Sequence, residues 1–287
     1  MGHRRAGAKC RFIRSFPPVL IVAALTASGA SAAERPDFKR FFDAAGTDGT
    51  IVVRDAENGA ETVYNPQRAA QGFLPASTFK VPNSLIAIET GLVEDVDRDA
   101  FRWDGTRFMV DGKPLLPPAC DADINLRVAL RNSCIWVYQQ LARRIGVATY
   151  ARYLGEMKYG NGNITSVPVD WFWLRGDFKI SAQNQAEFLS GLARNRLPFS
   201  NQTMATVKDI MTVEKTPLYS LHGKTGYIDA TAPRVGWWVG FVDRHPGTTV
   251  FALNIDLTRP EHSKARMDIT RAVLRELKVL PSEAEAR

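Results

Sequence analysis

The chain of 287 residues predicts an α/β (α+β) fold with a mainly antiparallel sheet of five to six strands, built from both chain ends and flanked by helices. Segments rich in β-branched and aromatic residues lie near the start and the end of the chain, and helical apolar spacing fills the middle. The composition, 45% hydrophobic and 23% charged, fits one globular unit. We therefore expect an inserted, all-helical lobe over roughly residues 80–215.

The first 32 residues have the features of a secretory signal peptide, which leaves residues 33–287 as one domain. A basic start without acids precedes the short apolar run Val19–Leu25, and Ala30-Ser31-Ala32 is a cleavage signal. We expect export to the periplasm, with no membrane attachment after cleavage. Five positive charges lie in this segment, and subtracting them from the net +7 leaves about +2. No later stretch interleaves basic and aromatic residues, so a nucleic-acid partner is not expected.

The mature chain begins with a predicted β-hairpin. Its strands cover residues 49–55 and 61–65 and are joined by the turn-forming residues 57–59. A loop over residues 66–76 then leads to a helix that starts at Ser77 and runs through an apolar stretch to Ile88.

Pro82 and Asn83 stand in the first turns of that helix. Proline has no backbone donor, so Pro82 should kink the helix. Asn83 either repairs part of the lost hydrogen bonding or points into a functional site, and the sequence leaves both alternatives open.

The middle of the chain is predicted to be loop-like over residues 92–123 and helical after that. Gly146 ends the first helix, and Ser181 and Ser200 are the N-cap residues of the last two. The four predicted helices cover residues 124–145, 148–157, 181–195 and 200–213.

The C-terminal part returns to strands and closes with a helix. Three strands are predicted over residues 218–227, 234–242 and 248–257, because β-branched and aromatic residues dominate them. The turn-forming residues 243–247 join the last two strands. Residues 263–277 have the spacing of an amphipathic helix.

Two cysteines, Cys120 and Cys134, remain after signal cleavage. An exported protein permits a disulfide between them. We expect two separate thiols, because Cys134 lies inside a motif, Ser-x-Ile, that a crosslink could strain. The three mature histidines lack metal-ligand spacing, so no metal site is expected.

Ser77 and Lys80 form an S-x-x-K motif at a predicted helix start. Residues three apart lie on one helix face, and the serine lies near unsatisfied backbone N–H groups and the positive end of the helix dipole. The pair supports nucleophilic catalysis if the lysine is a base and not an ammonium ion. Alone, however, S-x-x-K more often represents a capping serine and a solvated lysine.

Three further short sequences change that balance: Ser133-Cys134-Ile135, Tyr159-Gly160-Asn161 and Lys224-Thr225-Gly226. Each alone has an ordinary structural interpretation, namely a turn within a helix, a turn, and a cation on a strand. In this order with S-x-x-K they are far more specific.

The chain resembles the class D β-lactamases, or oxacillinases, on these motifs and on residues 79–83, 173–176 and 236–240. The resemblance extends over about residues 49–277. The family usually has valine where Ile135 stands and phenylalanine where Tyr138 stands, and these departures affect substrate preference. The resemblance implies the β-lactamase/transpeptidase-like fold and hydrolysis of β-lactam antibiotics.

The resemblance also implies a mechanism. Ser77 forms the acyl-enzyme, and Lys80, carboxylated by CO2 to N6-carboxylysine, is the general base. No dissociable cofactor is expected beyond CO2 or bicarbonate. Tyr227 and Ser77 supply the backbone N–H groups of the oxyanion hole, and Trp173 donates its indole N–H to the carbamate.

The remaining implied roles concern proton transfer and substrate binding. Ser133 and Lys224 relay a proton to the departing lactam nitrogen. Thr225 and Arg266 hold the substrate carboxylate, although Arg266 could also be an ordinary exposed helix arginine. The residues expected to contact substrate are Thr225, Gly226, Arg266, Ile135, Tyr138 and Leu174.

Two other functions share these motifs. A D,D-peptidase or a β-lactam sensor would acylate without efficient turnover, but such proteins usually carry an anchor, an extra domain or transmembrane helices. The expected partners are small β-lactam substrates, and both a monomer and a homodimer remain open. Substrate range should depend on the loops around residues 100–118 and 228–234.

Overall fold

The computed structural model describes residues 1–3, 7 and 32–282. Most of the signal peptide predicted over residues 1–32 therefore lies outside the described residues. Among the described residues, no helix is both long and apolar enough to span a bilayer. Nor does this part of the chain group three or more His, Cys, Asp or Glu side chains where they could hold a metal ion.

A seven-stranded sheet joins both ends of the chain, in the order β1-β3-β2-β9-β8-β7-β6. All neighbours are antiparallel except β1 and β3. The strands are β1 (Ala33–Glu34), β2 (Gly49–Asp55), β3 (Glu61–Tyr64), β6 (Thr212–Lys215), β7 (Ser220–Ile228), β8 (Arg234–Arg244) and β9 (Gly247–Leu257). The five predicted strands are all present. The sheet exceeds five to six strands because it also contains β1, of two residues, and β6, which begins inside a segment predicted to be helical.

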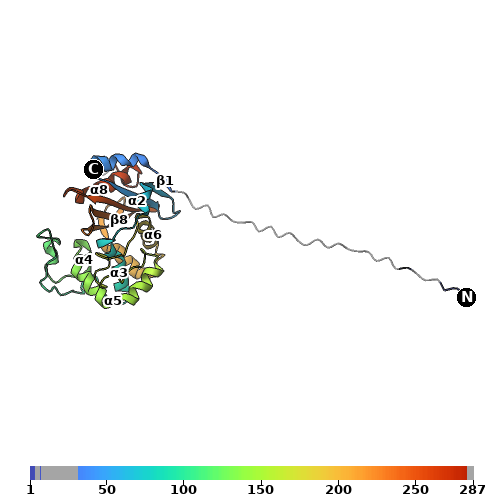
Figure 1. Cartoon of the computed structure of the whole chain (residues 1–287), viewed down its shortest axis with the longest axis horizontal. Helices are drawn as coiled ribbons and strands as arrows, with labels where there is room; N and C mark the ends of the chain where they lie inside the picture. The colour runs from blue at the N-terminus through green and yellow to red at the C-terminus, as the bar shows by residue number, and fades with distance from the viewer. Residues whose placement is uncertain (4–6, 8–31, 283–287) are drawn as a thin grey trace.

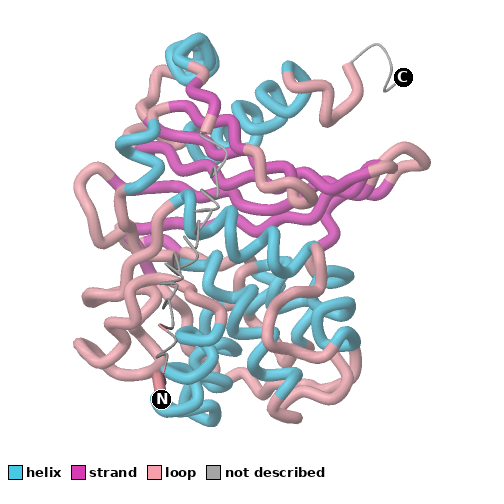
Figure 2. Tube along the Cα trace, turned by 90° about the vertical axis from the view of Figure 1, so that its right-hand side faces the viewer, coloured by secondary structure: helices cyan, strands magenta, loops and turns pink. Residues whose placement is uncertain are grey.

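The two faces of the sheet are covered by different helices. Ile51 and Val53 of β2 pack with α1 (Lys39–Ala45) and α8 (His262–Glu276) on one face. Val52 points to the opposite face, because successive strand side chains alternate. Figure 1 shows α8 on one side of the sheet and α3, α4 and α5 on the other. Figure 2 shows the sheet separating a small group of helices from a larger one.

The larger group of helices covers the face of the sheet toward which Val52 points. Its helix α6 packs directly on β2, β8 and β9. The remaining elements are η1 (Pro36–Phe38), α2 (Pro66–Ala70), η2 (Ala76–Phe79), α3 (Lys80–Glu89), β4 (Met109–Val110), β5 (Lys113–Pro114), η3 (Pro118–Cys120), α4 (Leu126–Asn132), α5 (Ile135–Glu156), α6 (Ala182–Ala193) and α7 (Asn201–Ile210).

The predicted helix caps are confirmed. The Ser181 side chain accepts a hydrogen bond from the backbone N–H of Asn184, and Ser200 accepts one from Thr203. Gly146, with φ of 76°, interrupts the helical dihedral angles of α5 where the prediction ended the first helix.

Several local predictions were wrong. The segment 66–76 contains the short helix α2, capped by Asn65. The helix expected over 124–145 breaks at Ser133, which adopts the left-handed conformation with φ of 59°. Pro82 leaves α3 uninterrupted, because it lies in the first turn, where backbone donors have no partner within the helix.

A disulfide joins Cys120 and Cys134, so the expectation of two free thiols was wrong. The two Cα atoms are 5.4 Å apart, within the ordinary range for a disulfide. The helix break at Ser133 brings Cys134 to the start of α5, beside η3. The indole of Trp136 also donates to the Cys120 carbonyl oxygen. The crosslink therefore anchors the turn that carries Ser133.

We predict that thiol reagents label no cysteine in the denatured, unreduced mature protein and label two after reduction. Replacing Cys120 and Cys134 together by alanine should lower the free energy of unfolding by about 3 kcal/mol, since a short loop is no longer closed in the unfolded chain. Urea unfolding of both proteins measures this loss. Labelling of two thiols before reduction would contradict the pairing.

Candidate active site

Lys80 lies beside Ser77 at the junction of η2 and α3. Its Nζ donates to the Ser77 Oγ at 2.8 Å, as the S-x-x-K spacing predicts. Lys80 is fully buried, whereas Ser77 is half-buried. Burial, and next the nearby ammonium of Lys224, lower the pKa of Lys80 well below its usual value. The amine is therefore biased toward its neutral, basic form.

The turn that carries Ser77 is held from several sides. Ala76, in the left-handed conformation with φ of 48°, donates its N–H to the Trp173 carbonyl oxygen at 2.9 Å. The Thr78 hydroxyl accepts a bond from Gln185 and donates to the Pro75 carbonyl oxygen. Such a backbone conformation is costly for a non-glycine residue and persists only where its surroundings enforce it.

The Tyr-Gly-Asn motif supports this turn and does not line the cleft. Tyr159 is buried, contacts the Phe79 ring, and donates to Gln185 at 3.4 Å. Gln185 in turn donates to Thr78. The motif therefore acts on Ser77 through packing and one hydrogen-bonded chain.

Ser133 and Lys224 meet across the two lobes. The Lys224 Nζ donates to the Ser133 Oγ at 2.5 Å and to the Thr225 carbonyl oxygen at 3.0 Å. Burial and the charge of Arg266 lower the pKa of Lys224 to about 7. Lys224 can therefore give up and take back a proton near neutral pH.

The end of β7 forms the sheet side of the site. Strand β6 pairs with β7 only as far as His222, and the next residue, Gly223, donates its N–H to the Met211 carbonyl oxygen. From Lys224 onward, the outer edge of β7 therefore faces η2 and not another strand. A side-chain carbon at Gly226 would lie 3.1 Å from the Pro75 carbonyl oxygen. Glycine therefore favours this close approach, because a side chain here would crowd η2 against β7.

Arg266 is held against the same strand. It reaches β7 from α8 and donates to the Gly226 carbonyl oxygen at 2.6 Å. Burial lowers its pKa to about 10, and its Nε has no hydrogen-bond partner among the described residues. These contacts exclude the ordinary exposed arginine that the sequence left open.

A cleft of about 500 Å³ opens in front of Ser77. Eight of the predicted site residues line it: Ser77, Ser133, Ile135, Leu174, Thr225, Gly226, Tyr227 and Arg266. Apolar side chains from the β4–β5 hairpin and its flanks, with Trp171, Ile135 and Leu174, form part of its wall. The cleft therefore suits a small, partly apolar anion.

Three predicted residues lie behind the cleft. Tyr138, predicted from the family resemblance to bind substrate and to surround the modified Lys80, lies beside Lys80 and does not line the cleft. It is fully buried, with its ring 5.2 Å from the Lys80 Nζ and its hydroxyl 3.0 Å from Ser84. Trp173 is also fully buried, and its Nε1 has no hydrogen-bond partner among the described residues. Asn83 is fully buried in α3 and does not line the cleft.

Sequence reasoning missed two ion pairs at the mouth of the cleft. Arg175 pairs with Asp229 at 2.6 and 3.1 Å, and both line the cleft. Arg234 pairs with Asp111 at the tip of the β4–β5 hairpin, at 2.8 Å. In the sequence, only the turn-forming pair Asp111-Gly112 indicated the hairpin that brings Asp111 to this position. The Arg234–Asp111 pair joins the two loops that were expected to control substrate range, and the Arg175–Asp229 pair fixes the second of them to the segment before α6.

We predict that the stability of Lys224→Met relative to wild type depends on pH. The lysine pKa is about 10.4 when unfolded and about 7 when folded, so between these values the unfolded state binds more protons. Wild-type stability relative to the variant should therefore rise from pH 7 to pH 10.5 and stay constant below pH 7. Urea unfolding across this range should show a rise on the order of a few kcal/mol.

Lys264→Met on the exposed side of α8 is the matched control, since its ammonium remains in solvent. A stability difference for Lys224→Met that stays flat across the same pH range would contradict the buried, partly neutral amine.

Comparison with known proteins agrees with this geometry. Residues 49–275 match the family described as penicillin binding protein transpeptidase domain. Beta-lactamase OXA-2 of Salmonella typhimurium is 40% identical over 251 residues, covering 86% of this chain and 86% of that protein. Beta-lactamase OXA-5 of Pseudomonas aeruginosa is 36% identical over 259 residues, covering 89% and 94%.

Solved structures show the same similarity. The class D β-lactamase YbXI from Nostoc superposes with a TM-score of 0.79 at 39% identity, covering 85% of this chain and 99% of that one. FUS-1 (OXA-85), a class D β-lactamase from Fusobacterium nucleatum subsp. polymorphum, gives a TM-score of 0.79 at 35% identity, covering 86% and 99%. Together with the site geometry, these matches show that the chain belongs to the class D β-lactamase family.

Proposed function

We propose that this protein hydrolyses β-lactam antibiotics through an acyl-enzyme on Ser77, with carboxylated Lys80 as general base, and that it confers β-lactam resistance. One observation carries the proposal: a fully buried lysine amine lies 2.8 Å from the hydroxyl of a serine that faces the cleft. A neutral amine at this position is both basic and able to react with CO2.

Acylation begins when the Ser77 Oγ attacks the lactam carbonyl. The backbone N–H groups of Ser77 and Tyr227 stabilise the oxyanion. The close packing of η2 against β7 at Gly226 supports this assignment, because it draws the two backbone segments together across the cleft.

The residues around Lys80 fit a carbamate. The Trp173 indole N–H is buried without a partner, and such a donor is costly unless an acceptor is supplied. A carbamate on Lys80 supplies acceptor oxygens and acts as the general base. Trp173 would hold the carbamate, while Tyr138 and Phe79 exclude water from the buried space around the Lys80 amine, which we call the Lys80 chamber.

Proton return uses the second lysine. Lys224, with its pKa about 7, passes a proton through Ser133 to the departing lactam nitrogen. Thr225 and Arg266 bind the substrate carboxylate, since both line the cleft and a guanidinium forms strong, charge-assisted hydrogen bonds with a carboxylate.

Turnover separates this function from the alternatives. A D,D-peptidase or sensor domain would release about one equivalent of product and then stall. We further propose that residues 1–32 direct residues 33–287 to the periplasm. The domain contains a helical lobe over roughly residues 80–215. We also propose that small β-lactams are its partners and that no dissociable cofactor is needed.

We predict that Ser77→Ala abolishes β-lactam turnover while the protein stays folded. Loss of a nucleophile typically removes several orders of magnitude of rate. Mass spectrometry with a poor substrate should place the adduct on the Ser77 peptide of the wild type. Ser263→Ala removes another hydroxyl that lines the cleft and should retain activity. An adduct elsewhere, or near-normal turnover of Ser77→Ala, would disprove the assignment.

We predict a 13C carbamate signal from wild-type enzyme given labelled bicarbonate, absent from Lys80→Ala. Activity should fall below neutral pH, because protonated amine cannot hold CO2, and recover with added bicarbonate. Trp173→Ala should weaken carbamate retention and slow deacylation more than acylation, with rescue by bicarbonate.

Trp171→Ala is the matched control, since it removes an indole that lines the cleft and not the Lys80 chamber. Normal turnover in CO2-free buffer without a carbamate signal would show that Lys80 acts as a free amine.

A further inference from the structure

A second cavity, of about 300 Å³, lies next to the catalytic cleft. Thr225 lines both cavities. The two cavities are also bordered by the same three elements, α4, β7 and α8. On α4, Arg131 lines the second cavity and Asn132 the cleft, and on α8, Met267 lines the second cavity and Arg266 the cleft. The second cavity therefore lies beside the cleft along β7, on the other side of the Lys224–Ser133 contact.

The wall of the second cavity is partly apolar. Leu130 from α4, Met211 after α7, Trp238 from β8 and Met267 from α8 contribute to it. Leu130, Met211 and Trp238 are buried. A flat hydrocarbon or heteroaromatic group fits such a surface, because it removes apolar area from water on both sides.

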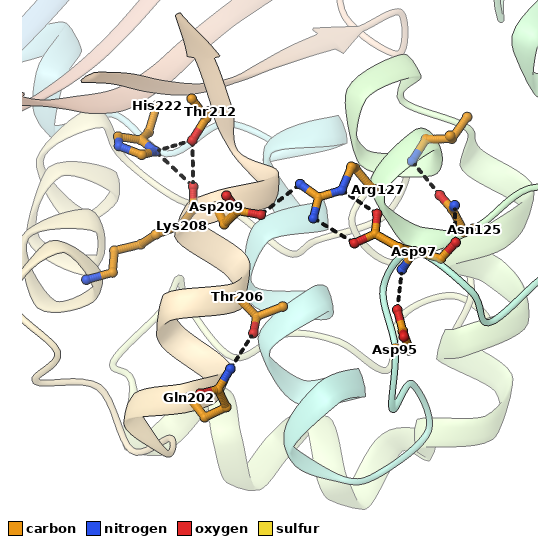
Figure 3. Close-up of polar contacts among 11 residues, drawn as sticks. Asp95, Asp97, Asn125, Arg127, Gln202, Thr206, Lys208, Asp209, Thr212 and His222 are labelled. Carbon is orange, nitrogen blue, oxygen red and sulfur yellow. Dashed lines mark hydrogen bonds and ion pairs between the residues drawn. The ribbon is translucent and has the colours of Figure 1, made fainter. Parts of the chain in front are cut away.

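Basic side chains border the same cavity, but two of them are already neutralised. Arg127 lies between Asp97 and Asp209, with contacts of 2.5 and 2.8 Å, as Figure 3 shows. Arg271 pairs with Glu214 at 2.6 Å. Neither guanidinium offers an unbalanced charge to a ligand.

Arg131 is different. It lies one helical turn after Arg127 on α4, is exposed, and makes no hydrogen bond or ion pair with any described residue. Of the described arginines that line the second cavity, Arg131 is therefore the one whose guanidinium is not paired with a carboxylate. Lys224 also lines the cavity and adds positive charge when protonated, so an anion here would be balanced by Arg131 and in part by Lys224.

We propose that the second cavity binds an anionic, partly apolar substituent of the β-lactam, with Arg131 as its cationic partner. This subsite rests on the proposed function, because a substrate held through its carboxylate at Thr225 and Arg266 directs the neighbouring ring substituent along β7. The ligand class is a bicyclic β-lactam whose second ring carries, beside the carboxylate, a group ending in a sulfonate or carboxylate.

The experiment compares two cephalosporins that differ only in whether this substituent ends in a sulfonate or in an uncharged group. With the mature protein at low ionic strength, Arg131→Ala should lower kcat/KM for the charged member about three- to five-fold, as for an exposed ion pair, mainly through KM. Arg131→Glu should lower it about ten-fold or more, because repulsion replaces attraction. The uncharged member should be unaffected, and added salt should reduce the difference.

Arg144→Glu is the matched control. Arg144 is exposed on α5, makes no described contact and lines neither cavity, so it changes net charge equally without touching the subsite. Equal losses for both cephalosporins in Arg131→Glu, or the same selective loss in Arg144→Glu, would overturn the subsite.

The two proposals fail separately. Wild-type turnover of the uncharged cephalosporin tests the proposed function and does not depend on Arg131. If the wild type acylates without turnover, the same comparison on acylation rates still tests the subsite. Selective loss of acylation with the charged member supports it, and unselective loss overturns it.

Discussion

Burial of the Lys80 amine against Ser77 is the constraint on which the rest of the site depends. An ammonium ion is disfavoured in dry surroundings, so the fold converts an ordinarily cationic side chain into a potential base. Keeping this chamber dry requires a continuous wall of aromatic rings. Phe79 stacks on Trp173 at 5.5 Å, Phe172 packs edge-on against both, and Tyr138 covers the amine from α5.

The same chamber must open toward substrate on one side, and the sheet provides that side. Strand β6 stops pairing at Gly223, which leaves the edge of β7 free beside η2. Gly226 permits the close approach, and Lys224 then reaches Ser133 across the lobes. The candidate site thus lies where the helical lobe meets the sheet, so changes in their packing alter distances within it.

Electrostatics favour anions throughout this region. Arg266 remains cationic at neutral pH with its pKa of about 10, and Lys224 adds positive charge when protonated, whereas Lys80 is biased toward its neutral form. The carboxylate nearest the cleft, Asp229, is paired with Arg175 and so does not oppose them. The unpaired Arg131 extends this positive character into the second cavity.

The sequence by itself determined the features that depend on near neighbours in the chain. The five predicted strands, the serine caps of α6 and α7 and the Ser77–Lys80 contact follow from alternation, capping and a three-residue spacing. Only the tertiary structure decided the short strands, the break at Ser133 and the Cys120–Cys134 disulfide. Each of these depends on partners distant in sequence, whose packing energy outweighs the local preference that a sequence pattern records.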